Sequence, residues 1–326
     1  MKEQILQFLR QKDGFVSGQA LCEHLGVSRT AVWKCINTLK KEGYEIESVT
    51  RKGYRLLQSP DLLKEEVVRQ YLPEEFWPGP VFCFPSVDST NEEAKRQAMR
   101  GIGDGALFVT EEQTAGKGRR GRVWSSPAGQ DIFCSMLLRP SLPPERASML
   151  TLVTALAAAA AFEKYGGAGC QIKWPNDVVW HGKKLCGILT EMGLEMDEIS
   201  YVVIGVGFNI NREDFPEEIA AMATSLYRET GQRTVRAAFL ADFLREFQER
   251  YDIFLKEQSF EPFVKEYASK LVNVGREVRL IRRGQEIIRR AVGVNERGEL
   301  LVQDADGQTE CICSGEVSVR GLYGYV

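Results

Sequence analysis

Apolar positions in the first sixty residues recur at helical spacing three times and then alternate with polar ones. The pattern predicts helices at 2–12, 17–26 and 29–42, and strands at 44–49 and 53–57. Ser17 and Ser28 each stand where a hydroxyl can cap the second or third helix. A short turn joins those two helices, so residues 1–60 are expected to form a helix-turn-helix followed by a β-hairpin wing.

From residue 61 the pattern changes to strands that alternate with helices. Residues 61–80 are expected to form a linker with a helix at 61–72, and residues 81–270 a mixed α/β domain. The expected strands are 81–84, 106–110, 131–138, 171–173, 177–180, 184–192 and 201–208. The expected helices are 91–100, 145–165, 234–256 and 260–270.

The last segment, 271–326, contains only short strands and turns. Strands are expected at 277–281, 286–294, 300–303, 308–313 and 317–322, with hairpin turns at 295–298 and 304–307. Such a segment predicts a small β-barrel. The whole chain is therefore expected to be a multidomain α+β protein.

Composition narrows the class of protein without naming a function. The 326 residues carry a net charge of −3, so any contact with nucleic acid has to come from a local basic surface. Eight cysteines form no CxxC pair and there are two histidines, so no metal site is expected. The N-terminus lacks an apolar signal core, and the Ala-rich stretch at 155–162 is too short to span a bilayer. A reduced, cytoplasmic protein without membrane association is expected.

The third predicted helix and the wing carry the candidate DNA contacts. Ser28, Arg29, Thr30, Trp33 and Lys34 lie at the start of the helix, and Arg51 and Lys52 at the tip of the hairpin. Base contacts of a helix-turn-helix usually come from the start of its second helix. The alternative is a helical bundle with a solvated charged face, but three helices, the turn and a basic hairpin together favour DNA binding.

The most unusual stretch is residues 116–124, which we call the basic loop. It reads Gly-Lys-Gly-Arg-Arg-Gly-Arg-Val-Trp, so three glycines separate four cations and an indole ends the run. Glycine lets the backbone approach a ligand, and guanidinium groups bind phosphate or carboxylate in a bidentate manner. Composition alone leaves a phosphate-binding loop evenly matched with a solvated loop or a nucleic-acid patch.

Four further clusters lie in the central domain. Asp-Ser-Thr-Asn at 88–91 suits helix capping or a ligand, and capping is the commoner role. Lys-Trp-Pro-Asn-Asp at 173–177 suits a β-turn or a set of ligand acceptors. Lys-Leu-Cys-Gly-Ile-Leu at 184–189 places a cation before an apolar strand, and Gly-Val-Gly-Phe-Asn-Ile-Asn at 205–211 is weak evidence by itself.

In this order, the motifs resemble those of the biotin–protein ligase family, in its bifunctional branch of the biotin operon repressor type. The resemblance covers nearly the whole chain, and the basic loop together with Lys-Trp-Pro-Asn-Asp is its most specific part. It implies a central domain like that of class II aminoacyl-tRNA synthetases, of the biotin/lipoate ligase type, and a C-terminal SH3-like barrel. The implied domains are 1–60, 61–80, 81–270 and 271–326.

The resemblance implies a reaction in two steps. Biotin and ATP, with Mg²⁺, form biotinyl-5′-AMP, and the biotinyl group then passes to a lysine of a biotin carboxyl carrier protein. The implied biotin site is Ser89, Thr90, Asn91, Gln113, Gly116, Lys117, Gly118, Arg119 and Lys184. The implied ATP or adenylate site is Arg120, Arg122, Trp124, Lys173, Asn176 and Asn209. Lys117, Arg119 and Lys184 are expected to act in catalysis, with Asp177 beside the incoming lysine; the partner roles of Asn176 and Glu191 are left open.

One position departs from the family pattern. The first cation of the family loop is commonly arginine, whereas this chain has Lys117. Lysine keeps the charge but loses the planar fork of donors, so we expect activity to be retained and the affinity for biotin or the adenylate to change.

The resemblance also implies partners and leaves rivals. The expected partners are the carrier protein of acetyl-CoA carboxylase, with pyruvate carboxylase as a further candidate, and operator DNA of biotin synthesis or transport genes. The adenylate is expected to order the basic loop as a lid and to favour a homodimer. The rivals are a lipoate ligase, a transcription factor that only senses a metabolite, and a ligase without DNA-binding function.

Overall fold

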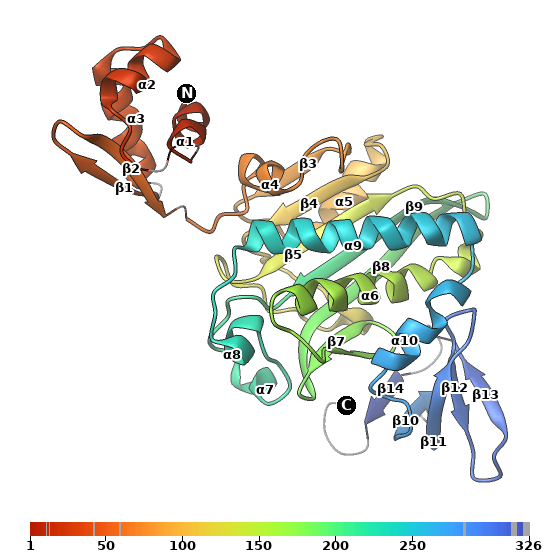
Figure 1. Ribbon diagram of the computed structural model, residues 1–326. Helices are drawn as coiled ribbons and strands as arrows, with labels where there is room; N and C mark the ends of the chain where they lie inside the picture. Colours follow the sequence, from red (N-terminus) through yellow and green to blue (C-terminus); the bar gives the residue numbers. More distant parts are fainter. Residues whose placement is uncertain are drawn as a thin grey trace. The chain divides into compact units, whose positions relative to one another are not determined.

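The computed structural model describes residues 1–10, 12, 14–41, 43–58, 60–282, 285–313 and 318–321. The chain divides into two compact units, Met1–Leu62 and Leu63–Val326 (Figure 1). Each unit has its own buried apolar cluster.

The first unit is a winged helix, as predicted. Its elements are α1 (Lys2–Arg10), α2 (Gly18–Leu25), α3 (Arg29–Lys41) and the antiparallel hairpin of β1 (Glu45–Val49) and β2 (Gly53–Gln58). Ser17 caps α2 by accepting a hydrogen bond from the Ala20 amide, and Gly26 ends the helix in the left-handed region. The core contains Ile5, Leu21 and Ile36, one from each helix, so the helical spacing of apolar residues is what holds the three helices together.

The second unit is built on one seven-stranded sheet with the order β3-β4-β5-β9-β8-β7-β6. The strands are β3 (Val81–Phe84), β4 (Ala106–Thr110), β5 (Ile132–Leu138), β6 (Gln171–Lys173), β7 (Asp177–Trp180), β8 (Lys183–Glu195) and β9 (Glu198–Phe208). β3 and β4 are parallel, and the other neighbouring strands are antiparallel. All seven residues of β5 are buried, because helices cover both faces of the sheet.

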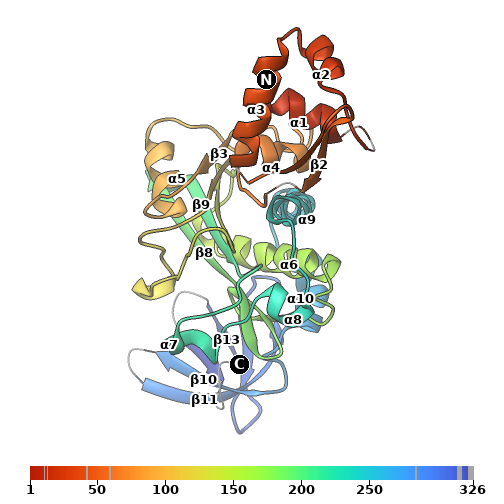
Figure 2. The ribbon, with the colours of Figure 1, turned by 90° about the vertical axis from the view of Figure 1, so that its left-hand side faces the viewer.

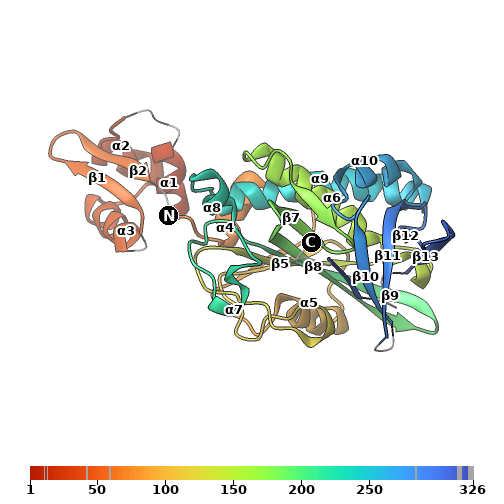
Figure 3. The same ribbon diagram turned by 90° about the horizontal axis from the view of Figure 1, so that it is seen from below.

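The helices of this unit divide between the two faces of the sheet. α6 (Met149–Lys164) and α9 (Arg236–Glu257) lie along one face, and α5 (Thr90–Met99) lies on the other (Figures 2 and 3). The helical segment Pro144–Lys164, which contains α6, is long and apolar enough to cross a membrane by composition, but most of it is buried in the unit. Its side chains pack on α9 and the sheet, so it is a core helix. α4 (Glu65–Tyr71), α7 (Glu217–Ala220), α8 (Leu226–Thr230) and α10 (Val264–Lys270) complete the set in the described part of the chain.

A five-stranded antiparallel sheet, ordered β13-β12-β11-β10-β14, forms the C-terminal part of the same unit. Its strands are β10 (Glu277–Arg282), β11 (Gln285–Val294), β12 (Leu300–Gln303), β13 (Thr309–Ile312) and β14 (Ser318–Gly321). The Trp174 indole donates a 3.0 Å hydrogen bond to the carbonyl of Gly298. Val294, Leu300 and Ile312 belong to the same buried cluster as the seven-stranded sheet, so the two sheets share one hydrophobic core.

Three helices, α4, α6 and α10, begin later in the chain than the sequence predicted. α4 begins at Glu65 and not at 61, because Leu63 lies in an extended segment whose amide donates to the Glu111 carboxylate. A 3₁₀ turn at Pro144–Arg146 precedes α6, which begins at Met149 and not at 145. A second such turn, Glu261–Phe263, precedes α10. The two short helices α7 and α8 were not predicted, and the predicted limits at 42, 317 and 322 lie outside the described residues.

Candidate functional site

A pocket with an empty volume of about 440 Å³ opens on the sheet of the second unit. Its walls come from the start of α5, the basic loop and the adjoining strands β8 and β9. The lining residues are Ser89, Thr90, Asn91, Gln113, Lys117, Gly118, Arg119, Trp124, Asn176, Lys184, Gly187, Ile188, Leu189, Gly205, Val206 and Gly207. Ten of these were predicted as site residues, so segments about a hundred positions apart do converge on one cavity.

Three glycines make the floor of the pocket. A Cβ atom on Gly207 would lie 2.5 Å from the Trp124 ring, and one on Gly187 would lie 2.7 Å from it. The indole therefore rests on the bare backbone of β8 and β9. A Cβ atom on Gly205 would lie 2.0 Å from Oδ1 of Asn91, so this position also requires glycine. The sequence pattern had marked 205–211 only weakly, because close approach from a distant segment leaves no local signal.

The Asp88–Asn91 corner is fixed by hydrogen bonds among side chains. The amide and hydroxyl of Thr90 donate to Oε1 of Gln113 at 3.0 and 3.2 Å. The buried Ser135 hydroxyl lies 2.8 Å from the Thr90 hydroxyl and 2.6 Å from Oδ1 of Asn91. Gln113 in turn donates to the Ser126 hydroxyl at 3.0 Å. The orientation of these polar groups is therefore set before any ligand arrives.

Helix capping, the commoner role for Ser89, does not apply here. Ser89 occupies the N-cap position of α5, but its side chain makes no capping hydrogen bond and instead lines the pocket. The carboxylate of Asp88 accepts the Ser89 amide at 2.8 Å and pairs with both terminal nitrogens of Arg96. The hydrogen bond from Arg96 lowers the pKa of Asp88 to about 2.

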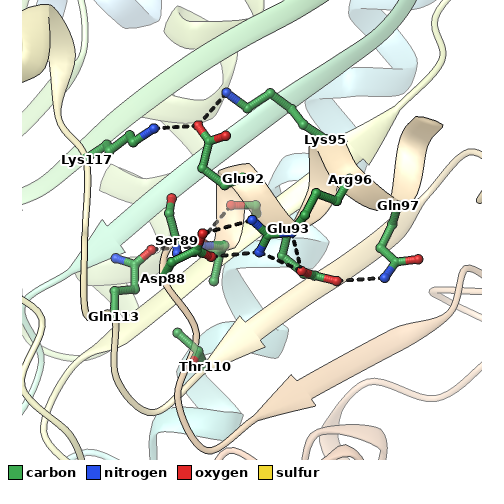
Figure 4. Close-up of polar contacts among 12 residues, drawn as sticks. Asp88, Ser89, Glu92, Glu93, Lys95, Arg96, Gln97, Thr110, Gln113 and Lys117 are labelled. Carbon is green, nitrogen blue, oxygen red and sulfur yellow. Dashed lines mark hydrogen bonds and ion pairs between the residues drawn. The ribbon is translucent and has the colours of Figure 1, made fainter. Parts of the chain in front are cut away.

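Two cations of the basic loop, Lys117 and Arg119, contact other side chains of the same unit. Lys117 lies 2.8 Å from the Glu92 carboxylate (Figure 4), and Arg119 donates to Oδ1 of Asn176 at 2.9 Å. Arg120 and Arg122 point into solvent, and Arg120 has a positive φ of 58°. Burial lowers the pKa of the Arg119 guanidinium, while the charge of Asp177 raises it. Two of the four cations, Lys117 and Arg119, thus line the pocket, and the other two do not.

Lys184 and Asp177 form an ion pair of 2.6 Å at the edge of the pocket. The ammonium group of Lys184 also lies 4.9 Å from the centre of the Trp124 ring, within the range of a cation–π contact. Asp177 is buried at the start of β7, opposite Lys173 on β6. The pair places one cation at the pocket and one carboxylate directly behind it.

Six predicted site residues do not line the pocket: Gly116, Arg120, Arg122, Lys173, Asp177 and Asn209. Gly116, the first residue of the basic loop, is buried, and a Cβ atom there would come within 2.5 Å of the Trp124 carbonyl oxygen. The Asn209 amide donates to the carbonyls of Lys184 and Thr224, so it supports the chain behind the site. Sequence reasoning missed Ser135 and Glu92, whose contacts join segments that no short motif connects.

The predicted DNA contacts all lie on the surface of the first unit. Ser28, Arg29, Thr30, Trp33, Lys34, Arg51 and Lys52 are exposed. Trp33, on α3, keeps 57% of its surface in solvent, which is unusual for an indole in a folded unit. The Ser28 hydroxyl accepts from the Ala31 amide at 3.3 Å, as expected for a cap, and Arg51 sits at the hairpin tip with a φ of 68°.

Among the described residues, no group of three or more His, Cys, Asp or Glu side chains is arranged to hold a metal ion. The carboxylates nearest the pocket, Asp177 and Glu92, are each paired with a lysine.

The chain matches three domain families. Residues 83–209 match the biotin/lipoate A/B protein ligase family, residues 2–55 an HTH domain, and residues 274–320 a biotin protein ligase C terminal domain. The first match contains every residue that lines the pocket.

Curated proteins and solved structures agree with these matches. The bifunctional ligase/repressor BirA of Bacillus subtilis is 38% identical over 308 residues, which are 94% of each chain. The protein of the same name from Escherichia coli is 33% identical over 310 residues, 94% of this chain and 93% of that one. The biotin protein ligase from Aquifex aeolicus, solved in complex with biotin and ATP, is 34% identical with a TM-score of 0.65 and covers 74% of this chain and 99% of its own.

Proposed function

Because this chain belongs to the family of bifunctional biotin ligase/repressors, we propose that one polypeptide both attaches biotin to a carrier protein and represses transcription. It is a biotin ligase that uses ATP, with a helix-turn-helix domain for DNA. The resemblance first seen in the sequence motifs is thereby confirmed. The observation that best supports the chemistry is the convergence of Lys117, Arg119 and Lys184 on a glycine-floored pocket.

The first step, formation of biotinyl-5′-AMP, brings together two anions. An oxygen of the biotin carboxylate has to attack the α-phosphorus of ATP and displace pyrophosphate, so the pocket must offset the repulsion between the two anions. Lys117, Arg119 and Lys184 supply three cations at the pocket, and the magnesium that accompanies ATP supplies more. A carboxylate is already a nucleophile, so no general base is required, and positioning with electrostatic stabilisation accounts for the rate.

The polar corner of the pocket suits the ureido ring of biotin. That ring has two N–H donors and one carbonyl acceptor, and Ser89, Thr90, Asn91 and Gln113 offer hydroxyl and amide groups on one side of the cavity. Gln113 and Thr90 are locked to each other, so their remaining hydrogen-bonding groups have fixed directions. We assign the ureido end of biotin to this corner, and the carboxylate end to Lys117, Arg119 and Lys184.

The nucleotide is assigned to the other side of the basic loop. Trp124 offers an aromatic face for adenine, and we assign Arg120, Arg122 and Lys173 to the polyphosphate. Asn176 already accepts a hydrogen bond from Arg119, so it positions that cation. Asn209 contributes from behind the pocket, by holding the backbone of Lys184. When the nucleotide arrives, the exposed Arg120 and Arg122 have to turn inward, which makes the loop the lid of the site.

In the second step a lysine of the carrier attacks the adenylate. Asp177 is the group that we place beside this lysine, because it is a carboxylate behind the pocket with Lys184 as its partner. There it can act as a general base that takes a proton from the incoming ammonium group, so that the neutral amine attacks the carbonyl carbon of the adenylate and AMP leaves. Biotin-dependent carboxylases are the class of acceptor that fits the family. We propose the carrier domain of acetyl-CoA carboxylase, with pyruvate carboxylase as a further candidate.

For regulation, we propose that the adenylate-bound protein is a cytoplasmic homodimer that binds an operator of biotin synthesis or transport genes. A two-fold dimer would present two winged helices to a two-fold site. Exposed Trp33, Lys34, Arg51 and Lys52 are the residues that we assign to DNA contact. Sedimentation with and without biotin plus MgATP tests the dimer, and an unchanged mass would contradict it.

Mass spectrometry of a carrier domain tests the catalytic proposal. The carrier is incubated with the protein, MgATP and either biotin or lipoate. We expect a mass increase equal to one biotinyl group, and none with lipoate. Modification by lipoate alone would favour a lipoate ligase.

Equal affinity of the adenylate-loaded protein for a biotin operator and for random DNA at matched salt would contradict the repressor function.

A further inference from the structure

A chain of alternating charges leads from Lys117 in the basic loop to Asn91 at the pocket, through Glu92, Lys95 and Glu191, which are not assigned to substrates. Lys117 contacts Glu92 at 2.8 Å, and Glu92 contacts Lys95 at 2.7 Å (Figure 4). Lys95 then contacts Oε1 of Glu191 at 3.0 Å. The other oxygen of Glu191 accepts from the Asn91 amide at 2.8 Å. Three separate segments, the loop, α5 and β8, are thereby joined.

The two ends of this charge chain differ in rigidity. Asn91 is buried, and it also bonds to the Leu189 carbonyl and the Ser135 hydroxyl. Lys117 is 50% exposed, whereas its partner Glu92 is 27% exposed. Lys117 lies between Gly116 and Gly118, which restrict the backbone least of all residues. Glu92 is therefore the fixed partner, and Lys117 is the group whose position it determines.

From this geometry we infer that Glu92 is a positioning residue that holds Lys117, and with it the basic loop, at the pocket before biotin binds. The inference rests on the proposed function for its substrate, the carboxylate of biotin. Glu92 itself does not line the pocket. It acts through Lys117, which does.

Glu92 can hold Lys117 without withdrawing it from the substrate. An ammonium group has three donors, so Lys117 can keep its contact with Glu92 while it donates to an anion in the pocket. If Lys117 moves away from Glu92, the Glu92 carboxylate still has Lys95 as its counter-ion. The hydrogen bonds from Lys117 and Lys95 lower the pKa of Glu92, so the carboxylate is charged at neutral pH. Glu191 in turn anchors Lys95 and Asn91.

Limited digestion with trypsin tests the inference on the ligand-free full-length protein. Arg120 and Arg122 in the basic loop are exposed cleavage sites, and Arg51 and Lys52 in the wing serve as an internal standard. We expect Glu92→Gln to speed cleavage in the loop about two- to five-fold relative to the wing, the range for a part-exposed ion pair. The parent should approach the variant as salt rises, because the lost contact is ionic.

A matched control lies one residue further along the same helix turn. Glu93→Gln removes the same charge from the first turn of α5, but Glu93 contacts Arg96 and Gln97 and not the loop (Figure 4). It should leave loop cleavage unchanged. In a Lys117→Gln background, Glu92→Gln should add nothing, since the pair is already broken. Equal effects of the two glutamate variants, or an additive double variant, would overturn the inference.

A kinetic measurement separates positioning from general loss of structure. Glu92→Gln should raise the KM for biotin about two- to five-fold, with a smaller change in kcat and none in the KM for ATP. A uniform fall in kcat with unchanged KM would overturn the assignment. The digestion uses no substrate, so its outcome stays interpretable even if biotin activation itself were not observed.

Discussion

Replacing Lys184 by methionine separates the structural role of the Lys184–Asp177 pair from its chemical role. The two side chains are 22% and 13% exposed and 2.6 Å apart, so the pair is neither a surface ion pair nor a fully buried one. Breaking a fully buried pair costs about 3–5 kcal/mol, and breaking an exposed pair costs about 0.2–1 kcal/mol. We therefore expect Lys184→Met to destabilise the second unit by about 2 kcal/mol, because Asp177 loses its close counter-ion.

The assay is thermal unfolding together with adenylate formation. A loss of about 2 kcal/mol corresponds to a fall in Tm of roughly 4–8 °C for a unit of this size. Adding Asp177→Asn should restore most of that loss, because the carboxylate that lacked a partner is then neutral. Adenylate formation should fall about 100-fold or more in both variants, since the cation that offsets the developing charge is missing in each.

Two results would refute this account of the pair. If the double variant were less stable than Lys184→Met, the unpaired Asp177 carboxylate would not be the cause of the lost stability. If Lys184→Met formed adenylate within a few-fold of the parent rate, Lys184 would not stabilise the transition state. Lys183→Met, one position earlier on β8, is the control for loss of a lysine in the same strand.

Three further predictions follow from contacts described above. Gly207→Ala places a Cβ atom 2.5 Å from the Trp124 ring, so it should displace the indole and weaken adenylate binding while the fold persists. A fluorescence titration with biotin and ATP measures the affinity. Unchanged affinity would contradict the packing of the indole on the glycine backbone. Asp88 has a pKa of about 2 in the folded protein against 3.8 as its ordinary value, so its contribution to stability is complete above about pH 4 and is lost as the pH falls through about 2. Asp88→Asn should remove that part of the acid dependence in an unfolding series, and an unaltered curve would show that Arg96 does not hold the carboxylate. Lys34→Ala should weaken DNA binding and lower the salt slope by about one, if Lys34 contacts a phosphate, while ligase activity stays at the parent level.

Local periodicity was sufficient for most of the fold. The caps Ser17 and Ser28, the winged helix, and nearly every strand of both sheets in the described part of the chain were predicted from residue spacing alone. The errors have a common cause. α7 and α8 span only four and five residues, too few for a helical repeat to be visible, and the 3₁₀ turn before α6 has no apolar period that separates it from the helix.

The site was predictable only where residues lie within a motif. Ser89, Thr90 and Arg119 could be proposed because family motifs mark them, and the structure brings them to one pocket. Glu92 and Ser135 could not be proposed, because each acts on a residue about 25 to 45 positions away along the chain. Two of the four cations of the basic loop have partners within the protein that the sequence did not indicate, because Lys117 contacts the Glu92 carboxylate and Arg119 donates to the amide oxygen of Asn176.

The hydrogen bond between the Trp174 indole and Gly298 also bears on how such a protein can be divided in evolution. The winged helix has a complete hydrophobic core within Met1–Leu62, so a gene could gain or lose it as an intact domain. The C-terminal sheet has no such independence. A deletion of the segment from Leu271 onward would uncover the indole of the Lys-Trp-Pro-Asn-Asp turn and remove Val294 and Leu300 from the core that also supports the catalytic strands. The regulatory part is thus separable, whereas the C-terminal sheet and the catalytic part have to be inherited together.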